Sequence, residues 1–353
     1  MVDIMDTFDL QKYQKNMRIM KYRRLLLLFL TLLIMAFLWI KSGVSISSDE
    51  RRLYASVSAA ESELRQWKGS LKKLNPDADI FKTGLIGLEW SPLSTTLGDL
   101  PAKRTACDPR WSIVVSRWLD RLNIRRGDSV VLLSSSSFPG MILNVLNALE
   151  SHGADTCMIL SLGSSTWGAN DPTMTWPVIS SHLRARGMLH TKQKYITLGG
   201  NGETGGGLSE EGISLMRQIA YTNATPLIVK KNLLEMIEWK MQIINGLKPK
   251  VVINIGGGHS AMGSDDAVTG FEPGLHISAD RTAGNGVMGR SLAAGYPVIH
   301  ILNIRELCAA NAVPYDTAPT YFFRGNRSYV FAAAGLAVFI FALFFFKRWK
   351  IMK

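Results

Sequence analysis

Short apolar segments alternate with helix-like segments through the middle of this 353-residue chain. The apolar segments are three to five residues long and rich in β-branched residues, which is typical of strands buried on both faces. They occupy residues 85–88, 130–133, 156–160, 195–198, 227–229, 251–255 and 298–302. Helical periodicity marks residues 109–122, 138–151, 177–186, 210–222, 233–247 and 287–294. This alternation predicts an α/β fold with a mostly parallel, doubly wound, Rossmann-like sheet.

Two longer apolar segments flank this middle part. Residues 25–40 and 329–346 contain no charged residue, and a helix of about 20 residues crosses the hydrocarbon core of a bilayer. Six basic residues precede the first segment and four follow the second, and basic flanks prefer the cytoplasm. The sequence therefore predicts two transmembrane helices with both termini in the cytoplasm. A cleaved signal peptide is the alternative for the first segment, because residues 42–45 are small.

This topology divides the chain into six parts. They are a cytoplasmic basic N-terminus (1–24), a first transmembrane helix (25–41), an amphipathic stalk helix with a linker (42–83), an extracytoplasmic α/β domain (84–328), a second transmembrane helix (329–346) and a cytoplasmic basic tail (347–353). The formal net charge is +12, of which +4 lies between residues 42 and 346. Most of the positive charge therefore reflects topology, and nucleic acid is not an expected partner.

Metals and cofactors are not predicted. The spacing of Cys107, Cys157 and Cys308 matches no metal motif. One disulfide is open to these three residues, but at least one thiol is left unpaired. Residues 284–289 fit the G-x-G-x-x-G pattern, yet no predicted strand leads directly into them, so no dinucleotide site is expected.

Unusual loops follow several predicted strands, where open α/β sheets bind their ligands. The first is the run from Ser134 to Ser137, which precedes a helix. Its hydroxyl and N–H groups suit a carboxylate or phosphate, or they supply a nucleophile. The alternative is a serine-rich capping turn.

Two further loops are rich in glycine. Residues 199–207 contain six glycines, with Gly200 and Asn201 as candidate contacts, while Glu203 would repel an anion. His259 follows Gly256, Gly257 and Gly258 directly after a strand, which favours a general base or a ligand contact. The alternative for residues 199–207 is a mobile flap, and both loops could also be only tight connections between elements.

Three other segments carry polar candidates. Residues 163–172 place Trp167 and Asn170 in a loop, as a ligand platform or as a pin to the core. Residues 89–105 follow the first predicted strand and end in basic residues, of which Arg104 suits a bidentate carboxylate clamp. Asp280 and Arg281 either line the pocket or form a surface ion pair.

The candidates divide into two sets. Nucleophilic catalysis needs a serine near a base that a carboxylate orients, so the candidate catalytic residues are Ser136, Ser137, His259 and Asp99. The candidate ligand-binding residues are Thr95, Thr96, Lys103, Arg104, Ser134, Ser135, Trp167, Asn170, Gly200, Asn201, Gly257, Gly258, Asp280 and Arg281.

Several of these strings resemble the bacterial poly-gamma-glutamate system proteins. They are GLIG at 84–87, SPLSTTLGDL at 91–100, AKRT at 102–105, SFP at 137–139, STWGANDP at 165–172 and LSEEG at 208–212. The resemblance covers about residues 84–314. It implies a role in the bacterial cytoplasmic (inner) membrane, beside the ligase and membrane proteins that make and export the polymer. It transfers no catalytic residues.

The expected function is a membrane-anchored accessory component of poly-gamma-glutamate synthesis, capsule formation or export. It would bind the carboxylate-rich polymer or its precursor through the loops at the strand ends. The expected partners are the lipid bilayer, the synthase and export proteins, and the anionic polymer. The first alternative is an extracytoplasmic hydrolase or transferase that trims or attaches the polymer with a Ser/His site. The second is a structural or interaction protein.

Overall fold

The computed structural model describes residues 7–41, 46–319 and 329–348. The chain separates into two compact units. One contains residues 46–321, and the other combines residues 1–45 with residues 322–353. Parts of the predicted basic termini, of the linker and of the domain end (1–6, 42–45, 320–328 and 349–353) lie outside the described residues.

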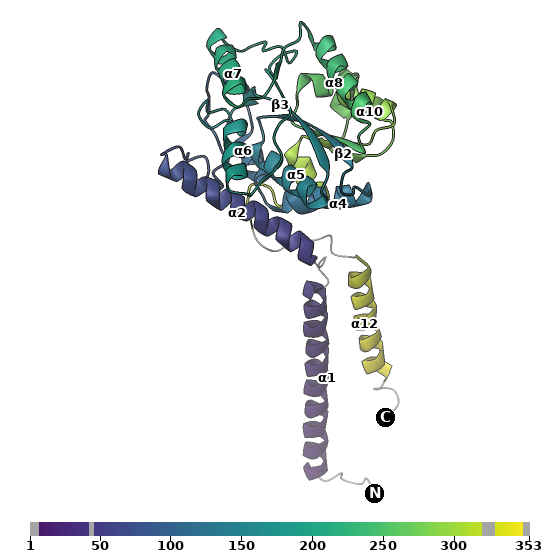
Figure 1. The fold of residues 1–353 in the computed structure, drawn as a ribbon. Helices are drawn as coiled ribbons and strands as arrows, with labels where there is room; N and C mark the ends of the chain where they lie inside the picture. The colour runs from purple at the N-terminus through teal and green to yellow at the C-terminus, as the bar shows by residue number, and fades with distance from the viewer. Residues whose placement is uncertain (1–6, 42–45, 320–328, 349–353) are drawn as a thin grey trace. The chain divides into compact units, whose positions relative to one another are not determined.

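A seven-stranded sheet forms the centre of the larger unit, in the order β6-β5-β3-β2-β7-β9-β8 (Figure 1). The strands are β2 (Ser129–Ser135), β3 (Asp155–Ser161), β5 (Tyr195–Thr197), β6 (Leu227–Ile228), β7 (Val251–Ile255), β8 (Gly274–His276) and β9 (Val298–Ile301). Every pair is parallel except β8 with β9. The order reverses beside β2, as in a doubly wound sheet. The predicted α/β class and mostly parallel sheet are therefore confirmed.

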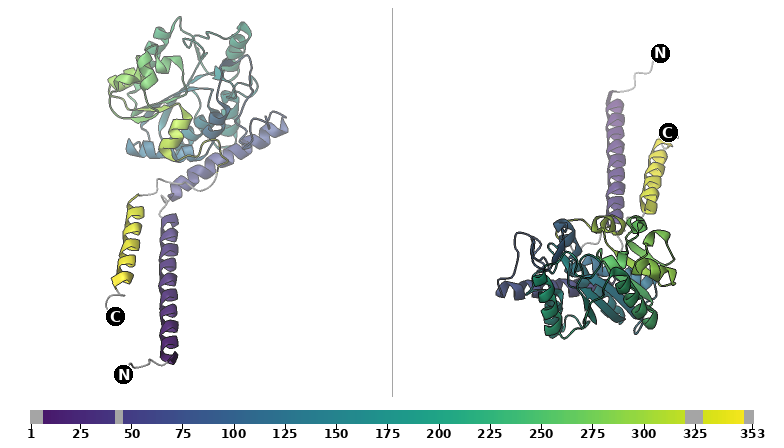
Figure 2. Two further views of the ribbon diagram at one scale, coloured as in Figure 1. Left: turned by 180° about the vertical axis from the view of Figure 1, so that it is seen from behind. Right: turned by 90° about the horizontal axis from the view of Figure 1, so that it is seen from above.

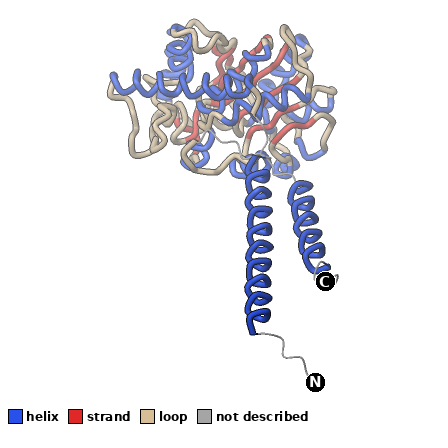
Figure 3. The backbone as a smooth tube through the Cα atoms, turned by 90° about the horizontal axis from the view of Figure 1, so that it is seen from below, coloured by secondary structure: helices blue, strands red, loops and turns tan. Residues whose placement is uncertain are grey.

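Helices surround this sheet, as Figure 3 shows with strands in red and helices in blue. They are α2 (Ser48–Ser70), α3 (Leu100–Ala106), α4 (Arg110–Arg121), α5 (Pro139–His152), α6 (Trp176–Ala185), α7 (Glu210–Thr222), α8 (Leu233–Leu247), α9 (His259–Met262), α10 (Val287–Ala293) and α11 (Ile304–Asn311). Two short 3-10 helices cover Asp266–Gly270 and Arg281–Ala283. A second, two-stranded sheet pairs β1 (Ser94–Thr96) with β4 (Ser164–Ser165).

The core consists of the alternating side chains of the sheet and the helices on its faces. Val131 and Leu133 of β2 belong to a buried cluster with apolar residues of α8 and α10, such as Ile244 and Leu292. Their neighbours Val130 and Leu132 are equally buried, and successive side chains of a strand point to opposite faces. Both faces of the sheet are therefore covered, as a parallel sheet requires.

The predicted amphipathic helix of residues 46–75 is present as α2, which lies on the outside of the larger unit (Figure 2). Ser47 and Glu50 form a capping box at its start. Leu53, Val57 and Leu64 are buried against the unit, where α2 contacts α4, α5 and α6. The predicted stalk helix therefore packs on the domain.

The predicted strand at residues 85–88 is wrong. Leu85 and Ile86 are buried as a strand would be, but their backbone pairs with a loop. The Gly87 N–H donates to the Trp167 carbonyl at 3.0 Å, and the Leu88 N–H donates to the Asn170 side chain at 2.9 Å. The Asn170 side-chain amide and the Trp167 carbonyl thus supply the backbone hydrogen bonds that a neighbouring strand would otherwise supply.

The smaller unit contains α1 (Thr7–Lys41) and α12 (Tyr329–Arg348), which contact each other. The apolar segments 25–40 and 329–346 lie within these two helices. In residues 7–41, 46–319 and 329–348, no helix is both long enough and apolar enough to cross a membrane. The predicted transmembrane helices 25–41 and 329–346 therefore find no support in the described residues.

At Gly168, the loop after β4 packs closely against the run from Ser134 to Ser137 that ends β2 and follows it. This run is called the serine loop. A Cβ there would lie 2.8 Å from the Ser136 carbonyl oxygen and 2.9 Å from the Ser137 Cα. We expect Gly168→Ala to lower the free energy of unfolding by about 1–3 kcal/mol, as overpacking does. Chemical denaturation measures this change.

The matched control is Gly246→Ala, because Gly246 lies in α8 with no atom near the added Cβ. That substitution should leave stability unchanged or raise it by up to about 1 kcal/mol through helix propensity. Equal stability of the two variants would contradict the close packing of this junction.

Candidate functional site

A cavity of about 570 Å³ lies where the parallel strands end. Ser135 and Ser161 reach it from the ends of β2 and β3, and Gly257 reaches it from the segment after β7. Gly199 and Leu302 follow β5 and β9 closely and line it as well. The cavity therefore occupies the position at which open α/β sheets bind ligands.

Most of the lining residues fall into two groups. The first, called here the lysine wall, comprises residues 95–99, 102 and 103 with Ser135, Ser137, Phe138 and Ser165. Within it, the Lys103 Nζ donates to the Ser137 carbonyl at 2.5 Å and to the Ser165 Oγ at 2.6 Å. The second, called here the glycine wall, comprises residues 199–201, 203, 206, 207 and 257–259.

Lys103 is buried in the lysine wall with 3% of its surface exposed. Its Nζ lies 3.7 Å from the centre of the Phe138 ring, and within the described residues no carboxylate lies within ion-pair distance of it. Burial lowers the pKa of Lys103 to about 7, although Cys107 and Asp99 act in the opposite direction. Near neutral pH, this side chain is therefore present in both its charged and its neutral form.

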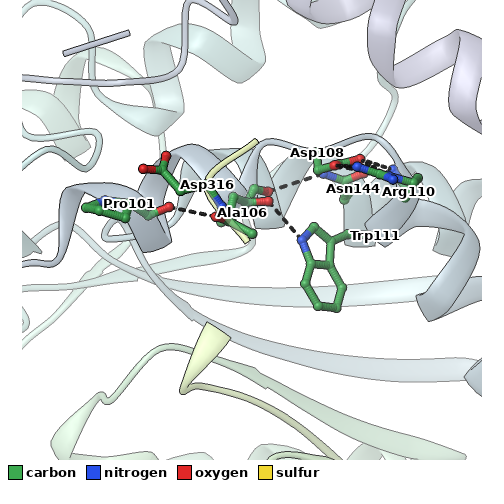
Figure 4. Close-up of polar contacts among 8 residues, drawn as sticks. Pro101, Ala106, Asp108, Arg110, Trp111, Asn144 and Asp316 are labelled. Carbon is green, nitrogen blue, oxygen red and sulfur yellow. Dashed lines mark hydrogen bonds and ion pairs between the residues drawn. The ribbon is translucent and has the colours of Figure 1, made fainter. Parts of the chain in front are cut away.

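The helix that carries Lys103, α3, is held by contacts that involve Pro101, Trp111 and Asp316 (Figure 4). The Thr105 Oγ1 donates to the Pro101 carbonyl at 2.7 Å and accepts from the Asp316 N–H at 2.8 Å. The Thr105 carbonyl accepts from the Trp111 ring N–H at 2.9 Å. A helix of seven residues has little stability alone, so these contacts hold it in place.

Glu203 ties the glycine wall to the core. Its side chain is 2% exposed, although it belongs to a surface loop. The Lys240 Nζ donates to Glu203 Oε1 at 2.5 Å, and the hydroxyls of Ser161 and Thr197 donate to the same oxygen at 2.9 and 2.7 Å. The Ser260 hydroxyl donates to Oε2. The loop is thus attached to β3, β5, α8 and α9 through one carboxylate.

These contacts set the charge of Glu203. Burial raises its pKa, but the Lys240 ammonium and the hydroxyl donors Ser260 and Thr197 outweigh burial and lower the pKa to about 2. Glu203 is therefore ionised, and the charge of Lys240 compensates it. The anion repulsion that the sequence suggested for Glu203 is cancelled by this partner.

His259 lines the cavity from the start of α9. Its Nδ1 accepts a hydrogen bond from the Gly202 N–H at 3.0 Å. In a neutral imidazole, the accepting nitrogen holds the lone pair and the other nitrogen carries the proton. His259 therefore presents Nε2–H as a donor and has no second lone pair to accept a serine proton.

The structure brings many of the predicted residues to one cavity. They are Thr95, Thr96, Asp99, Lys103, Ser135, Ser137, Gly200, Asn201, Gly257, Gly258 and His259. Of the predicted catalytic residues, Asp99 accepts a hydrogen bond from the Tyr315 hydroxyl, and the Ser137 Oγ accepts from the Ser165 N–H at 2.9 Å. In the described residues, neither is hydrogen-bonded to His259, and the catalytic assignment stays a prediction.

Other predicted residues lie outside this cavity. Ser136 is buried and donates to the Ser161 carbonyl at 2.9 Å. Arg104 donates to the Ala78 carbonyl at 2.8 Å and lies 3.6 Å from the Asp316 carboxylate. Asn170 is buried and pairs with the backbone of Leu88.

The remaining four have local contacts. Ser134 donates to the Ser135 carbonyl and borders a much smaller cavity beneath the site. Trp167 has a positive φ of 66° and pairs with the Leu88 carbonyl. Asp280 caps the 3-10 helix that begins at Arg281, through the Thr282 N–H and hydroxyl. These contacts account for Ser134, Trp167 and Asp280 without a ligand, and Arg281 begins the 3-10 helix.

Sequence reasoning missed Ser161, Ser165, Lys240 and Ser260. For Lys240 a signal exists: it lies four residues from both Met236 and Ile244, on the buried face of α8. A lysine on the apolar face of an amphipathic helix needs a buried partner. The three serines have no comparable signal, because strand ends and helix starts often carry hydroxyls.

In the described residues, the cysteines form no disulfide and no metal-binding cluster is present. Cys107, Cys157 and Cys308 are buried free thiols, so no disulfide joins them. In the part of the chain that the structure describes, no cluster of three His, Cys, Asp or Glu side chains is arranged to hold a metal ion.

Comparisons with protein-family models, with curated proteins and with solved structures gave no match. The resemblance to poly-gamma-glutamate system proteins and the function that it implies therefore stay predictions.

The Glu203–Lys240 pair makes a prediction for stability. Glu203→Gln leaves the Lys240 ammonium buried without a counter-charge, so the free energy of unfolding at pH 7 should fall by about 3–5 kcal/mol. Adding Lys240→Met removes the unpaired charge, and the double variant should be more stable than Glu203→Gln alone. Denaturant titration compares them, and equal losses in both variants would exclude this coupling.

The same pair has a defined pH dependence. The folded-state pKa of Glu203, about 2, lies below its ordinary value of 4.5, so the ionised carboxylate stabilises the fold above about pH 4.5. This contribution is lost as the pH falls from 4.5 towards 2. The stability difference between wild type and Glu203→Gln should be constant from pH 7 to pH 5 and shrink below pH 4.

Proposed function

We propose that this protein is an accessory component of poly-gamma-glutamate synthesis or export, and that it binds carboxylates of the polymer or its precursor in the cavity at the strand ends. The strings at residues 84–314 that resemble poly-gamma-glutamate system proteins support the pathway. The observation that supports binding is a set of hydrogen-bond donors in the glycine wall without acceptors. The synthase and export proteins of the pathway are the proposed partners, and nucleic acid is not one.

The donors are backbone N–H groups. Among the described residues, nothing accepts a hydrogen bond from the N–H of Gly200, Gly257 or Gly258. Each of these residues lines the cavity, and His259 adds its Nε2–H. Successive N–H groups of glycine-rich segments suit an anion, and a carboxylate offers two oxygens with several lone pairs.

Charge in the cavity agrees with this use. Lys240 compensates the carboxylate of Glu203, which otherwise would repel an anionic ligand. Asp99 lies in the other wall, where Tyr315 donates to it. Residues 42–346 carry a net charge of only +4, so we infer recognition by this local pocket rather than by the overall field.

The proposal includes attachment to the bacterial cytoplasmic membrane. Its support is the sequence: two uncharged segments, 25–40 and 329–346, with basic flanks. The α/β domain would then lie outside the cytoplasm, where the polymer emerges, with both termini inside.

The alternative function is an extracytoplasmic hydrolase or transferase that acts on the polymer. The specific observation in its favour is that the Ser165 hydroxyl of the lysine wall is hydrogen-bonded to a buried lysine, Lys103, in the same cavity. A Ser137–His259 arrangement has less support, because the His259 lone pair already accepts from Gly202.

Binding can be tested by removing one N–H group. Gly258 has φ −60°, which proline adopts without strain, so Gly258→Pro deletes a donor and retains the backbone shape. A hydrogen bond to a charged group contributes about 1.5–3 kcal/mol, so the affinity of full-length protein for a γ-linked glutamate oligomer should fall about 10- to 100-fold. Isothermal titration calorimetry measures it.

Gly258→Ala is the matched control, because it retains the N–H and meets no atom within 4 Å. Its affinity should equal that of the wild type. If the wild-type protein binds no oligomer at low salt, polymer binding is refuted; if the proline and alanine variants bind equally, the role of this N–H is refuted.

Membrane attachment is tested by fractionation of cells that produce the full chain. We expect the protein to sediment with membranes and to resist extraction at pH 11. External protease should reach the domain in intact spheroplasts. Removal of residues 1–41 and 329–353 should release the protein into the soluble fraction, and extraction of the full chain at pH 11 would contradict the anchors.

A further inference from the structure

The lysine wall holds a serine and a lysine in hydrogen-bonding contact at the surface of the cavity. The Ser165 Oγ lies 2.6 Å from the Lys103 Nζ. Ser165 belongs to β4 and is 7% exposed, and both residues line the cavity. A hydroxyl that borders a ligand cavity and touches an amine is positioned for activation as a nucleophile.

Burial without a counter-charge favours the neutral amine of Lys103. Lys103 has the Ser137 carbonyl, the Ser165 hydroxyl and the Phe138 ring as neighbours, and none of them is charged. In contrast, the Nζ of the buried Lys240 lies 2.5 Å from the Glu203 carboxylate, which supplies a counter-charge. A buried amine without a counter-charge releases its proton more easily, and such lysines act as general bases.

The backbone holds the pair in place. A Cβ on Gly98 would lie 2.9 Å from the Lys103 Cε and 3.1 Å from the Ser165 Oγ, so the Gly98 backbone packs directly against both side chains. The Ser165 N–H donates to the Ser137 Oγ at 2.9 Å. These contacts restrict the rotamers of the pair, as a preorganised catalytic site requires.

The same wall contains a donor that suits an oxyanion. In the described residues, no acceptor is present for the N–H group of Ser137. Ser137 lines the cavity, shortly before the 14-residue helix α5. Backbone N–H groups at such a position stabilise the negative charge that develops on a carbonyl oxygen during acyl transfer.

We propose that Ser165 is the nucleophile and Lys103 the general base of an acyl-transfer reaction on an amide that carries a neighbouring carboxylate. This inference rests on the proposed function for its substrate class, since the carboxylate would bind at the glycine wall while the amide reaches the lysine wall. The hydrolase or transferase alternative would then use Ser165 and Lys103 in place of the predicted Ser136, Ser137, His259 and Asp99.

The reaction balances with these groups and water. The Ser165 Oγ forms a bond to the amide carbonyl carbon as its proton passes to the neutral Lys103 Nζ. The carbon–nitrogen bond then breaks, and the leaving nitrogen takes its electron pair and the proton from Lys103. Lys103 then takes a proton from water, which attacks the carbonyl carbon of the resulting ester. The ester bond between this carbon and the Ser165 Oγ breaks, and Lys103 returns the proton to Ser165. An amine in place of water gives transfer instead of hydrolysis.

Covalent labelling tests the nucleophile without knowledge of the natural substrate. Full-length protein is treated with a fluorophosphonate, and the modified peptide is identified by mass spectrometry. We expect the adduct on Ser165 and none in Ser165→Ala. Lys103→Met and Lys103→Arg should slow labelling at least about 100-fold, because neither side chain acts as a base near neutral pH.

Controls separate a catalytic effect from damage to the fold. Ser151→Ala removes a hydroxyl of α5 that bonds to the Ala148 carbonyl, and Lys68→Met removes another buried lysine. Neither residue lines the cavity, so both variants should label at the wild-type rate. Equal labelling of wild type and the Lys103 variants, or an adduct on another serine, would overturn the proposal.

The pH profile supplies a second readout. The labelling rate should rise as Lys103 loses its proton, with a midpoint of about 7, and then level off. Asp99 and Cys107 influence Lys103, and Glu203 and His259 line the same cavity. If Lys103 is the base, His259→Gln should leave the midpoint of the labelling rate unchanged. Loss of the midpoint in His259→Gln would assign the base to histidine and contradict our proposal.

Cleavage of a γ-linked glutamate oligomer then separates this inference from the proposed function. We expect the wild type to cleave it and Ser165→Ala to bind it with unchanged affinity without cleavage. Binding without cleavage or Ser165 labelling would refute the catalytic pair and leave polymer binding intact. Labelling of Ser165 without any binding of the oligomer would refute polymer binding and leave the pair intact.

Discussion

The register of three central strands brings the whole site together. Ser134 of β2 pairs with Leu160 of β3 and with Ile255 of β7, so the three strands end at one level of the sheet. The serine loop, the loop before β4 and the loop that leads into α9 consequently leave the sheet side by side. A one-residue slip of a strand would turn its buried side chains to the opposite face. The core therefore enforces the register that the site depends on.

Given this register, the shape of the glycine wall depends on Glu203. Five of the glycines in residues 199–207 have positive φ values, so the loop uses backbone conformations that other residues seldom adopt. Such a loop has few side chains of its own to hold it. Glu203 reaches into the core instead, and its ionised form binds donors from four different elements. The interaction that fixes the loop also removes a negative charge from the cavity.

The central part of the fold could be predicted from the sequence, and much of the site could not. Buried strands such as Val251–Ile255 and amphipathic helices such as Leu233–Leu247 have periodic patterns that local sequence determines. The predicted strand at residues 85–88 was wrong because Asn170, 82 positions away from Leu88, supplies its hydrogen-bond partner. The contact of Lys103 with Ser165 likewise joins residues 62 positions apart. Glycine and serine content located the loops, but it did not show which side chains meet.

The two buried lysines of the site show how a partner determines chemistry. Lys240 and Lys103 are each 3% exposed, so burial disfavours the charged form of both. Glu203 supplies Lys240 with a counter-charge, and that pair acts as a structural tie. Lys103 has instead a carbonyl, a hydroxyl and an aromatic face, which support the ammonium less strongly. One lysine therefore holds the loop that shapes the cavity, and the other is the base of the reaction that we propose. A carboxylate within ion-pair distance of the Lys103 Nζ would make the second lysine resemble the first, and none of the described residues supplies one.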